Sequence, residues 1–542
     1  MKLKYFLLNI AICISFIYAK SSTSVTGDVS YYYMHRLSDQ STVNIPFRML
    51  NLNVSHQNNF LDINGTFALE YKNRSDVDFM EDSNPVDINT VLRELYLTYY
   101  LNNGEISVGK KLFTWGSVDE NSPIDVLNAF DYYYLLQGAS ERKLGTYSLS
   151  FDYYINNGTM KISGIFSPLH NANRYPIDDD EYEFGLPISI HPDQIVKLEK
   201  PSEFGLALQQ SFNRGDVTFS FFKGHDRAPS FSGFQNYVKI EKDNANDTWE
   251  NANYTFANII PDILYSYRLT EASNVGGVLL FDDFTIRYDY GMFKSYDNNN
   301  KEDFLDHPCY EGYGLEPSCS KIDHNVEKYA VAYANYIYNE DTQEYENIQD
   351  NDILINPKTG QFITENHESY LFNQKAEYTQ QTFQIELPLT DDYQLNLQYF
   401  KYELKDDKFQ ATNPLREGTI LPDLPLISLP DEITLEDIEG ALKAVFVPGV
   451  GAPFSNLSSE SCFISIEKKL LNNNLALTVS TLMDLDRGYG ELASFEVDYN
   501  FGSGLNAMFG LTKVLGDDEV SDYVFNELED FSHIRCEIKY HF

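Results

Sequence analysis

Basic residues, cysteine and tryptophan are all scarce in this sequence. Its 542 residues include 40 Lys and Arg against 81 Asp and Glu, which gives a formal net charge of −41 at pH 7, and only 5 Cys and 2 Trp. Nucleic acid is a poor partner for such a chain, because phosphate binding needs a basic surface. The acids instead indicate solvated segments, and they gather in polar stretches such as residues 178–181 and 340–352.

Long apolar runs are absent after the first residues, so the sequence does not predict a helical membrane protein. The mean hydropathy is −0.37, whereas a spanning helix needs about 20 consecutive apolar residues. The N-terminus carries Lys2 and Lys4, an apolar run over residues 5–18 and a small residue at Ala19. This order is typical of a secretory signal peptide, and we expect residues 1–19 to be removed. The alternative is a membrane-anchoring helix, for which the run is short.

Motifs of catalysis, cofactor binding and metal binding are also missing. No Gly-x-Ser-x-Gly, His-Glu-x-x-His or phosphate-binding loop occurs, and no Cys or His cluster has metal-ligand spacing. We therefore expect no enzyme activity, no catalytic residue, no cofactor and no metal, with a barrel hydrolase built from scattered Ser and His side chains as the alternative. Cys309 and Cys319 lie in one polar segment, and we predict a disulfide bond between them in an oxidising compartment.

Aromatic residues and period-two alternation are what the sequence has in abundance. It contains 40 Tyr and 37 Phe, and apolar residues recur at every second position in many short segments. Over residues 533–542, one parity is apolar and the other is charged or titratable. Such alternation is typical of β-strands with one apolar and one polar face. Segments of about ten residues are long enough for a tilted strand to cross a bilayer.

Short turns and long polar stretches alternate between these segments. Turn sequences such as Asn156-Asn157-Gly158 suit tight hairpins. This asymmetry is typical of outer-membrane barrels, which have short periplasmic turns and long extracellular loops. The segments number about eighteen, with sixteen as the alternative because 224–281 is ambiguous; residues 261–281 are interpreted as one irregular strand. The long loops are expected at about 115–142, 167–202, 224–260, 296–368 and 406–456.

The predicted fold is an all-β, closed antiparallel transmembrane β-barrel over residues 20–542. Closure is required because lipid offers no hydrogen-bond partner to the edge of an open sheet. An even number of strands leaves both termini on the periplasmic side. We therefore expect the chain in the outer membrane, in contact with lipid, and the sequence leaves its oligomeric state open.

The terminal strand resembles the assembly signal of Gram-negative outer-membrane proteins. The apolar parity of residues 534–542 ends with Tyr540 and Phe542. This resemblance implies recognition and insertion by the barrel-assembly machinery.

A second resemblance covers residues 108–131, which read Val-Gly-Lys-Lys-Leu-Phe-Thr-Trp-Gly-Ser-Val-Asp-Glu-Asn-Ser-Pro-Ile-Asp-Val-Leu-Asn-Ala-Phe-Asp. The segment is similar to a strand-and-loop motif of large bacterial porin-like barrels, in which a Gly and basic residues precede Trp-Gly, an Asp and then Pro-x-Asp-x-x-Asn-Pro-x-Asp. Ala129 stands where the motif has its second Pro. The resemblance implies a porin-like barrel and says little about its substrate.

The same segment predicts a loop that folds into the lumen. Gly116 lets the chain turn sharply after Trp115. We expect the loop to build a constriction from Trp115, Gly116, Asp119, Asp125, Asn128 and Asp131. The alternative is that these residues only cap turns and stabilise the loop.

The function predicted from these patterns is an outer-membrane porin or channel for passive or facilitated passage of small solutes. Acidic loops predict a weak preference for cations. Two alternatives are a transporter of hydrophobic or oligomeric substrates gated by the 406–456 loop, which contains a helix-like segment, and a surface interaction barrel without pore activity. Polar side chains expected to line the lumen are Asp152, Arg287, Asp289, Glu496, Asp498, Arg535 and Lys539.

Overall fold

The computed structural model describes most of the strand-forming part of the chain. The described residues are 21–43, 45–72, 88–135, 139–176, 195–196, 198, 200–242, 254–297, 369–390, 392–412, 446–521 and 523–542, with short strands between 327 and 363. The predicted signal peptide, the predicted Cys309–Cys319 disulfide and the helix-like segment of the 406–456 loop lie outside the described residues.

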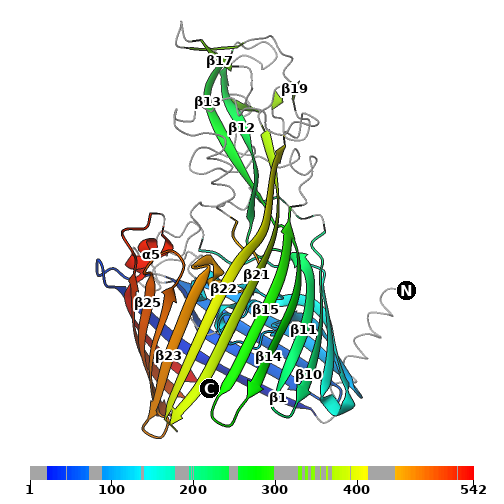
Figure 1. Ribbon diagram of the computed structural model, residues 1–542, viewed down its shortest axis with the longest axis vertical. Coiled ribbons are helices and arrows are strands. Elements are labelled where there is room, and N and C mark those ends of the chain that lie inside the picture. The colour runs from blue at the N-terminus through cyan, green and yellow to red at the C-terminus, as the bar shows by residue number, and fades with distance from the viewer. Residues whose placement is uncertain are drawn as a thin grey trace.

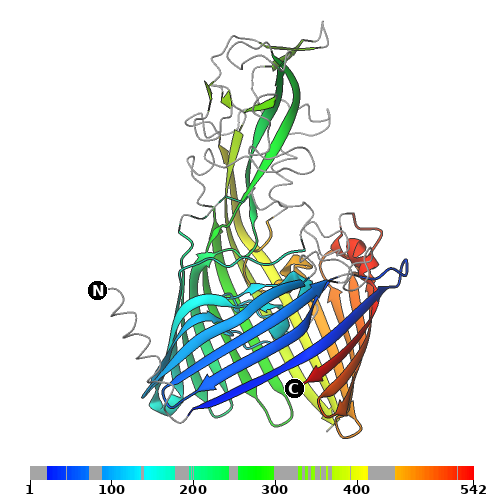
Figure 2. The same ribbon diagram turned by 180° about the vertical axis from the view of Figure 1, so that it is seen from behind.

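Eighteen of the described strands form one closed antiparallel ring (Figures 1 and 2). Each strand pairs with its neighbour in chain order, and the ring closes where the first strand pairs with the last, from Asp28 opposite His541 to Arg36 opposite His533. The ring thus confirms the predicted closed barrel of eighteen strands. They are β1 (Ser22–Arg36), β2 (Pro46–Gln57), β3 (Leu61–Lys72), β4 (Ile88–Leu101), β5 (Gly104–Lys111), β8 (Thr146–Ile155), β9 (Met160–Ser167), β10 (Glu203–Phe212), β11 (Gly215–His225), β14 (Leu269–Leu280), β15 (Thr285–Tyr296), β21 (Ser369–Thr390), β22 (Tyr393–Thr412), β23 (Glu460–Leu470), β24 (Leu475–Asp484), β25 (Glu491–Gly502), β26 (Leu505–Leu515) and β27 (His533–His541).

Side chains alternate between the two faces of the ring as their parity predicts. In β8, Leu149 and Phe151 are about half exposed on the outer face, whereas Ser148 and Ser150 are buried on the inner face. The outer face therefore carries aromatic and aliphatic residues, and the inner face carries hydroxyls, amides and charges. Such a distribution is stable when lipid surrounds the sheet and water or polar groups fill its centre. Among the described residues, no helix is both long enough and apolar enough to cross a membrane.

The hairpins at one end of the barrel are tight because their residues accept a left-handed backbone. Asn156, Asn157 and Gly158 have φ values of 51°, 56° and 87°, and they join β8 to β9 directly. At the other end the connections are long. We call these ends the short-turn end and the long-loop end.

A hairpin rises from the long-loop end, and the sequence did not predict it. It consists of β12 (Ser230–Lys242) and β13 (Tyr254–Ser266) and stands above the ring in Figure 1. The predicted irregular strand over 261–281 is therefore wrong, because β13 ends at Ser266 and the ring strand β14 begins at Leu269. Strands β21 and β22, which are 22 and 20 residues long in total, also continue past the ring at the long-loop end. Nearby short strands are β16 (Glu327–Val331), β17 (Tyr336–Asn339), β18 (Glu344–Asn347), β19 (Leu354–Ile355) and β20 (Phe362–Ile363).

Candidate pore constriction

Residues 112–135 and 139–145, between β5 and β8, fold into the ring, and we call them the inward loop. They contain β6 (Ala129–Phe130), the 3-10 helix η2 (Tyr132–Tyr134), α2 (Ala139–Arg142) and β7 (Lys143–Leu144). Residue 116 has no room for a side chain, because a Cβ atom there would lie only 2.1 Å from Oγ and 2.5 Å from Cβ of Ser122. Trp115 packs against Gly205 of β10, where a Cβ atom would lie 2.6 Å from the indole ring. The backbone bends at residues 117–120, so the chain turns after Trp115 and Gly116 rather than at them.

A carboxylate on a distant strand anchors the start of this loop. Asp289 of β15 lies six strands along the ring from β5 and is fully buried. Its Oδ2 accepts hydrogen bonds from the backbone N–H groups of Ser117 (2.8 Å) and Val118 (2.9 Å) and from the hydroxyl of Ser122 (2.7 Å). Asp289 does face inward, as its parity predicted, but the loop covers it. Its prediction as an open lumen-lining residue is therefore wrong.

One glutamine and one threonine side chain of β21 hold the next part of the loop. Gln384 accepts a hydrogen bond from the backbone N–H of Asp119 (3.0 Å) and donates one to its carboxylate (2.9 Å). Thr382 donates to the backbone carbonyl of Asn121 (2.7 Å). The Asn121 side chain in turn accepts from the backbone N–H of Phe454, at 3.0 Å. The loop is therefore fixed by strands and turns far from it in sequence.

Of the three aspartates predicted to line the constriction, only Asp119 is open to the lumen. Its side chain is 51% exposed, while Asp125 and Asp131 are 5% and 1% exposed. Asp125 forms an ion pair with Lys143 inside the loop. Asp131 caps the N-terminus of η2 by accepting from the N–H of Tyr133 and pairs with Arg174 at 3.1 Å. The constriction-lining prediction is therefore wrong for Asp131, and the alternative of a stabilising role describes it. Asp125 is buried and paired with Lys143, but it still contributes to the lining of the cavity beside the loop.

Asn128 also has a structural role, and its predicted place in the constriction lining is wrong. It is 1% exposed. Its side chain accepts a hydrogen bond from the backbone N–H of Phe113 (3.0 Å) and donates one to the Phe113 carbonyl (2.5 Å). The Asn128 amide thus pairs with the backbone at the start of the loop, as a neighbouring strand would. An asparagine suits this position because its amide carries one acceptor and one donor group.

Burial shifts the pKa of the loop carboxylate Asp131. Loss of solvent raises its pKa to about 6, because the charged form is poorly solvated inside the protein. The guanidinium of Arg174 opposes this shift and Glu70 adds to it. Glu70 shares Arg174 at 2.8 Å, so two carboxylates compete for one guanidinium.

Beside the inward loop lies a cavity of about 480 Å³ that is open to the lumen. Its charged lining residues are the acids Asp119, Glu120, Asp125 and Asp216 and the bases Lys143, Lys161 and Arg287. Four acids against three bases leave a net charge of −1. Arg287, predicted to line the lumen, does so; it pairs with Glu386 at 2.5 Å, lies 3.9 Å from Asp119 and donates to the Ser117 carbonyl.

A second cavity of about 280 Å³ is lined by β1 and by the C-terminal strands β22–β27, together with residues of the inward loop. Predicted lumen residues Glu496 and Arg535 line it and pair at 2.5 Å. The remaining predicted residues lie toward the short-turn end: Asp152 pairs with Ser163, Lys539 with Glu537 at 2.9 Å, and Asp498 is exposed on the same parity as Glu496.

Glu120 lines both cavities, and sequence analysis missed it. Its carboxylate pairs with the buried guanidinium of Arg142 at 3.1 Å, so two residues of the inward loop meet between the cavities. Its backbone has a φ of 25°, which is unusual for a residue with a side chain. No local sequence pattern indicates this arrangement, since it depends on how the loop folds back on itself.

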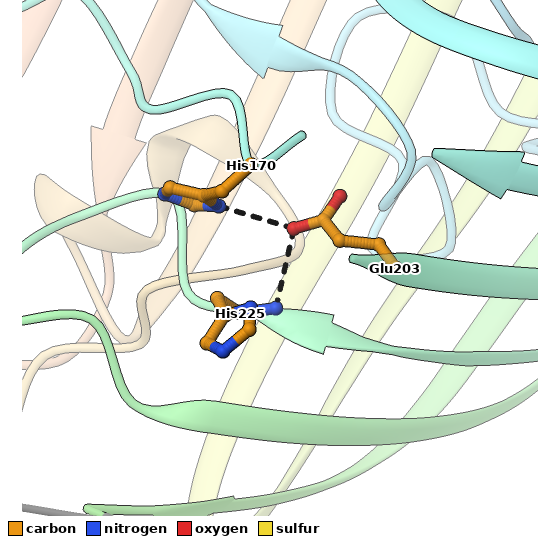
Figure 3. Close-up of side chains that lie close together, drawn as sticks. All are labelled: His170, Glu203 and His225. Carbon is orange, nitrogen blue, oxygen red and sulfur yellow. Dashed lines mark hydrogen bonds and ion pairs between the residues drawn. The ribbon is translucent and has the colours of Figure 1, made fainter. Parts of the chain in front are cut away.

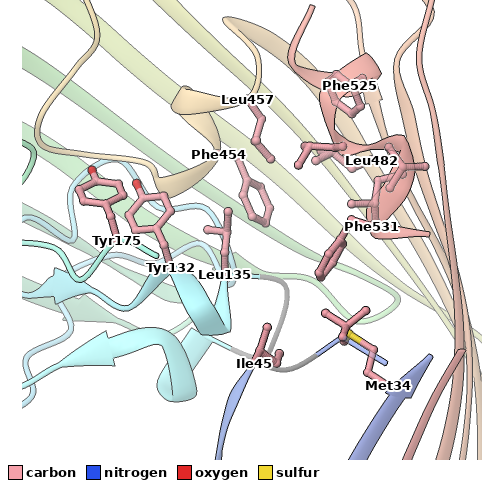
Figure 4. Close-up of a cluster of buried hydrophobic side chains, with 14 of the residues drawn as sticks. Met34, Ile45, Tyr132, Leu135, Tyr175, Phe454, Leu457, Leu482, Phe525 and Phe531 are labelled. Carbon is pink, nitrogen blue, oxygen red and sulfur yellow. The ribbon is translucent and has the colours of Figure 1, made fainter. Parts of the chain in front are cut away.

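An apolar cluster fixes the inward loop at the long-loop end. Figure 4 shows Tyr132 and Leu135 of the loop facing Phe454 and Leu457, with Phe525 and Phe531 beyond them. The last four belong to or flank η5 (Pro453–Asn456), α5 (Val524–Glu527) and η6 (Leu528–Phe531). Burial of such side chains contributes roughly 1.5–3 kcal/mol each, so this packing resists displacement of the loop.

The closed sheet, its apolar outer face and the loop in its centre define a transmembrane β-barrel with an internal constriction. No protein-family model matches the chain, and no curated protein matches its sequence significantly. Solved structures that resemble it include OccK9 (OpdG) of Pseudomonas aeruginosa (TM-score 0.42, 10% identity, 96% of this chain and 98% of that one covered). Others are OpdK of the same organism, with vanillate (0.43, 9%, 96% and 98%), and a BenF-like porin from Pseudomonas fluorescens (0.43, 9%, 96% and 98%).

Proposed function

We propose that the protein is an outer-membrane channel through which small hydrophilic solutes pass. The observation that carries this proposal is the inward loop, which leaves a cavity of about 480 Å³ open beside Asp119 and Arg287. A barrel built only as a surface scaffold has no need for a polar lumen with exposed charges. The long-loop end then faces outward and the short-turn end faces the periplasm, as in outer-membrane barrels.

The lining supports passage of small polar solutes rather than lipids. The wall of the cavity carries hydroxyl, amide and charged groups on strands and loop, such as Ser163, Gln209 and Thr218. These groups keep water in the lumen and exchange hydrogen bonds with a solute. The near balance of acids and bases predicts weak charge selection at the constriction. The excess of acids elsewhere in the chain favours cations weakly.

Conductance of the pure protein tests this proposal. The full mature chain, refolded in detergent, is added to a planar bilayer in KCl. We expect discrete current steps and a small reversal potential of cationic sign in a salt gradient. If correctly folded protein gave no current steps, the proposed channel function would be refuted. A clear anion preference would contradict the expected weak selection for cations.

We further propose that residues 1–19 direct export and that Tyr540 and Phe542 are read by the barrel-assembly machinery. Both aromatic rings lie on the outer face of the ring and are half exposed. Replacing both by Ser should reduce the amount of folded protein in the membrane, while leaving refolding in detergent intact. Equal membrane levels would argue against the assembly signal.

A further inference from the structure

Two histidines and a glutamate from three neighbouring strand ends meet at the long-loop end. His170 lies in the loop after β9, Glu203 is the first residue of β10 and His225 is the last residue of β11. Each offers one ligand atom, and these three atoms lie within 4.8 Å of one another. Figure 3 shows the Glu203 carboxylate beside both histidines, where Oε1 lies 3.0 Å from Nδ1 of the His170 ring and accepts a hydrogen bond from the backbone N–H of His225 at 3.3 Å. We call these residues the His-Glu-His group.

The group is buried and has unused hydrogen-bonding capacity. His225 is 8% exposed, and the side chains of His170 and Glu203 are 8% and 3% exposed. Nε2 of His170 and Nδ1 of His225 are buried atoms without a hydrogen-bond partner. Leaving a buried nitrogen unpaired costs about 1–3 kcal/mol, and an ion held by the group would satisfy Nδ1 of His225. His170 turns its other nitrogen, Nδ1, toward Glu203.

We propose that the His-Glu-His group binds a divalent transition-metal ion of the zinc class. Two imidazoles and one carboxylate are a common set of protein ligands for Zn²⁺, with water in the fourth position. Ligand atoms on a tetrahedral zinc ion lie roughly 3.3 Å apart, given bonds of about 2.0–2.1 Å. Nδ1 of His170 and Oε1 of Glu203 are already 3.0 Å apart. The third ligand, from His225, needs to move by only about 1–2 Å.

The surroundings fit the outer shell of a metal site. Arg227 is 2% exposed and donates to Oε1 of Glu203 at 2.7 Å, which orients the carboxylate and keeps it ionised. The His170 ring also lies against Tyr267, with ring centroids 4.4 Å apart. The positive charge of Arg227 opposes a cation, and we therefore expect modest affinity.

Arg227 also joins this group to the constriction. Its guanidinium donates to the backbone carbonyls of Val126 and Leu127 in the inward loop, both at 3.2 Å. The metal site is nevertheless separate from the proposed solute path, since none of its three ligands lines either cavity. Its test is independent of conduction.

Zinc content of the refolded full chain tests the proposal. The protein is incubated with ZnCl₂ and excess CaCl₂, which occupies carboxylate-only sites in the acidic loops, and free ions are removed before elemental analysis. We expect one Zn²⁺ per chain. His170→Gln and His225→Gln should each weaken binding at least ten-fold in a calorimetric titration. His541→Gln, which removes an exposed imidazole at the short-turn end, should leave binding unchanged.

Two outcomes would overturn the proposal. One is wild-type protein that retains no Zn²⁺ under these conditions, and the other is equal zinc binding by the wild type and by a folded double variant His170→Gln/His225→Gln. If the variants do not fold, Co²⁺ added to the wild type decides the matter. A strong visible absorption of four-coordinate cobalt supports the site, and only the weak absorption of hydrated Co²⁺ contradicts it.

Discussion

The hydroxyl of Ser122 donates a hydrogen bond of 2.7 Å to the carboxylate of Asp289, and this bond ties the inward loop to a strand six places away around the ring. The backbone N–H groups of Ser117 and Val118 donate to the same oxygen of Asp289. One carboxylate therefore holds three donor groups at the start of the loop.

Removing this carboxylate should widen the channel. In Asp289→Ala the loop loses its shared acceptor, and each buried donor left unpaired costs about 1–3 kcal/mol. We expect larger and more variable single-channel conductance. Asp289→Asn keeps one acceptor oxygen and should give an intermediate result. Gln209→Ala serves as the control, because it also removes side-chain atoms from the cavity wall but breaks no hydrogen bond to the loop. We expect this variant to show a uniform single-channel conductance. A wild-type conductance in Asp289→Ala would refute the anchoring role.

Charges in the larger cavity should shift ion selectivity in opposite directions. Asp119 is half exposed to the lumen and Lys161 lines the same cavity. Asp119→Asn should move the reversal potential in a KCl gradient toward anion preference, and Lys161→Gln should move it toward cations. Changes in permeability ratio on the order of two-fold are expected for single charges near a wet pore. Shifts of the same sign in both variants would show that neither side chain acts on passing ions.

Stability should increase as the pH falls from 7 to 5, in part because of Asp131. Its pKa is about 6 in the folded chain, above the ordinary value of 3.8 for an aspartate carboxyl. The folded state therefore binds the proton more tightly than the unfolded state, so the free energy of unfolding rises when this carboxyl is protonated. Over this pH range the gain is about 1 kcal/mol.

Urea unfolding of the refolded protein measures this contribution. Asp131→Asn should lose the gain between pH 7 and 5 and should show the wild-type slope between pH 7 and 8, where the carboxyl is ionised in both states. Parallel curves for the two proteins at every pH would contradict a raised pKa at Asp131.

Adjacent residues on opposite faces of β10 should respond differently to charge. Leu208 is 36% exposed on the outer face, and Gln209 lines the larger cavity. Leu208→Arg places a charge against lipid and should destabilise the barrel by about 2–4 kcal/mol if it lies near the bilayer midplane. Gln209→Arg should fold normally. Band shifts between heated and unheated samples on gels report folding, and equal folding of both variants would argue against a lipid-facing outer surface.

The barrel could be predicted from the sequence because each ring strand carries its own signal. Leu149 and Phe151 alternate with Ser148 and Ser150 without reference to any distant residue. The prediction was wrong over 261–281 because two strands with similar composition follow each other there, and the break after Ser266 leaves no clear mark. The parity also placed Asp289 correctly on the inner face, although it could not show what covers that residue.

The details of the constriction could not be predicted because they depend on contacts between distant segments. The spacing of Asp119, Asp125 and Asp131 suggests three equivalent carboxylates, yet two of them bind Lys143 and Arg174 and are buried. The His-Glu-His group has ligands 33 and 22 residues apart. Such spacing matches no local metal motif, and only the pairing of β9, β10 and β11 brings the ligands together.

The partners of the inward loop come much later in the chain than the loop itself. Ser117 precedes Asp289 by 172 residues, Asp119 precedes Gln384 by 265 and Asn121 precedes Phe454 by 333. The final size of the aperture therefore depends on residues from the last third of the polypeptide, so a chain shortened before Gln384 would keep the inward loop but lose these two fixed points of its wall.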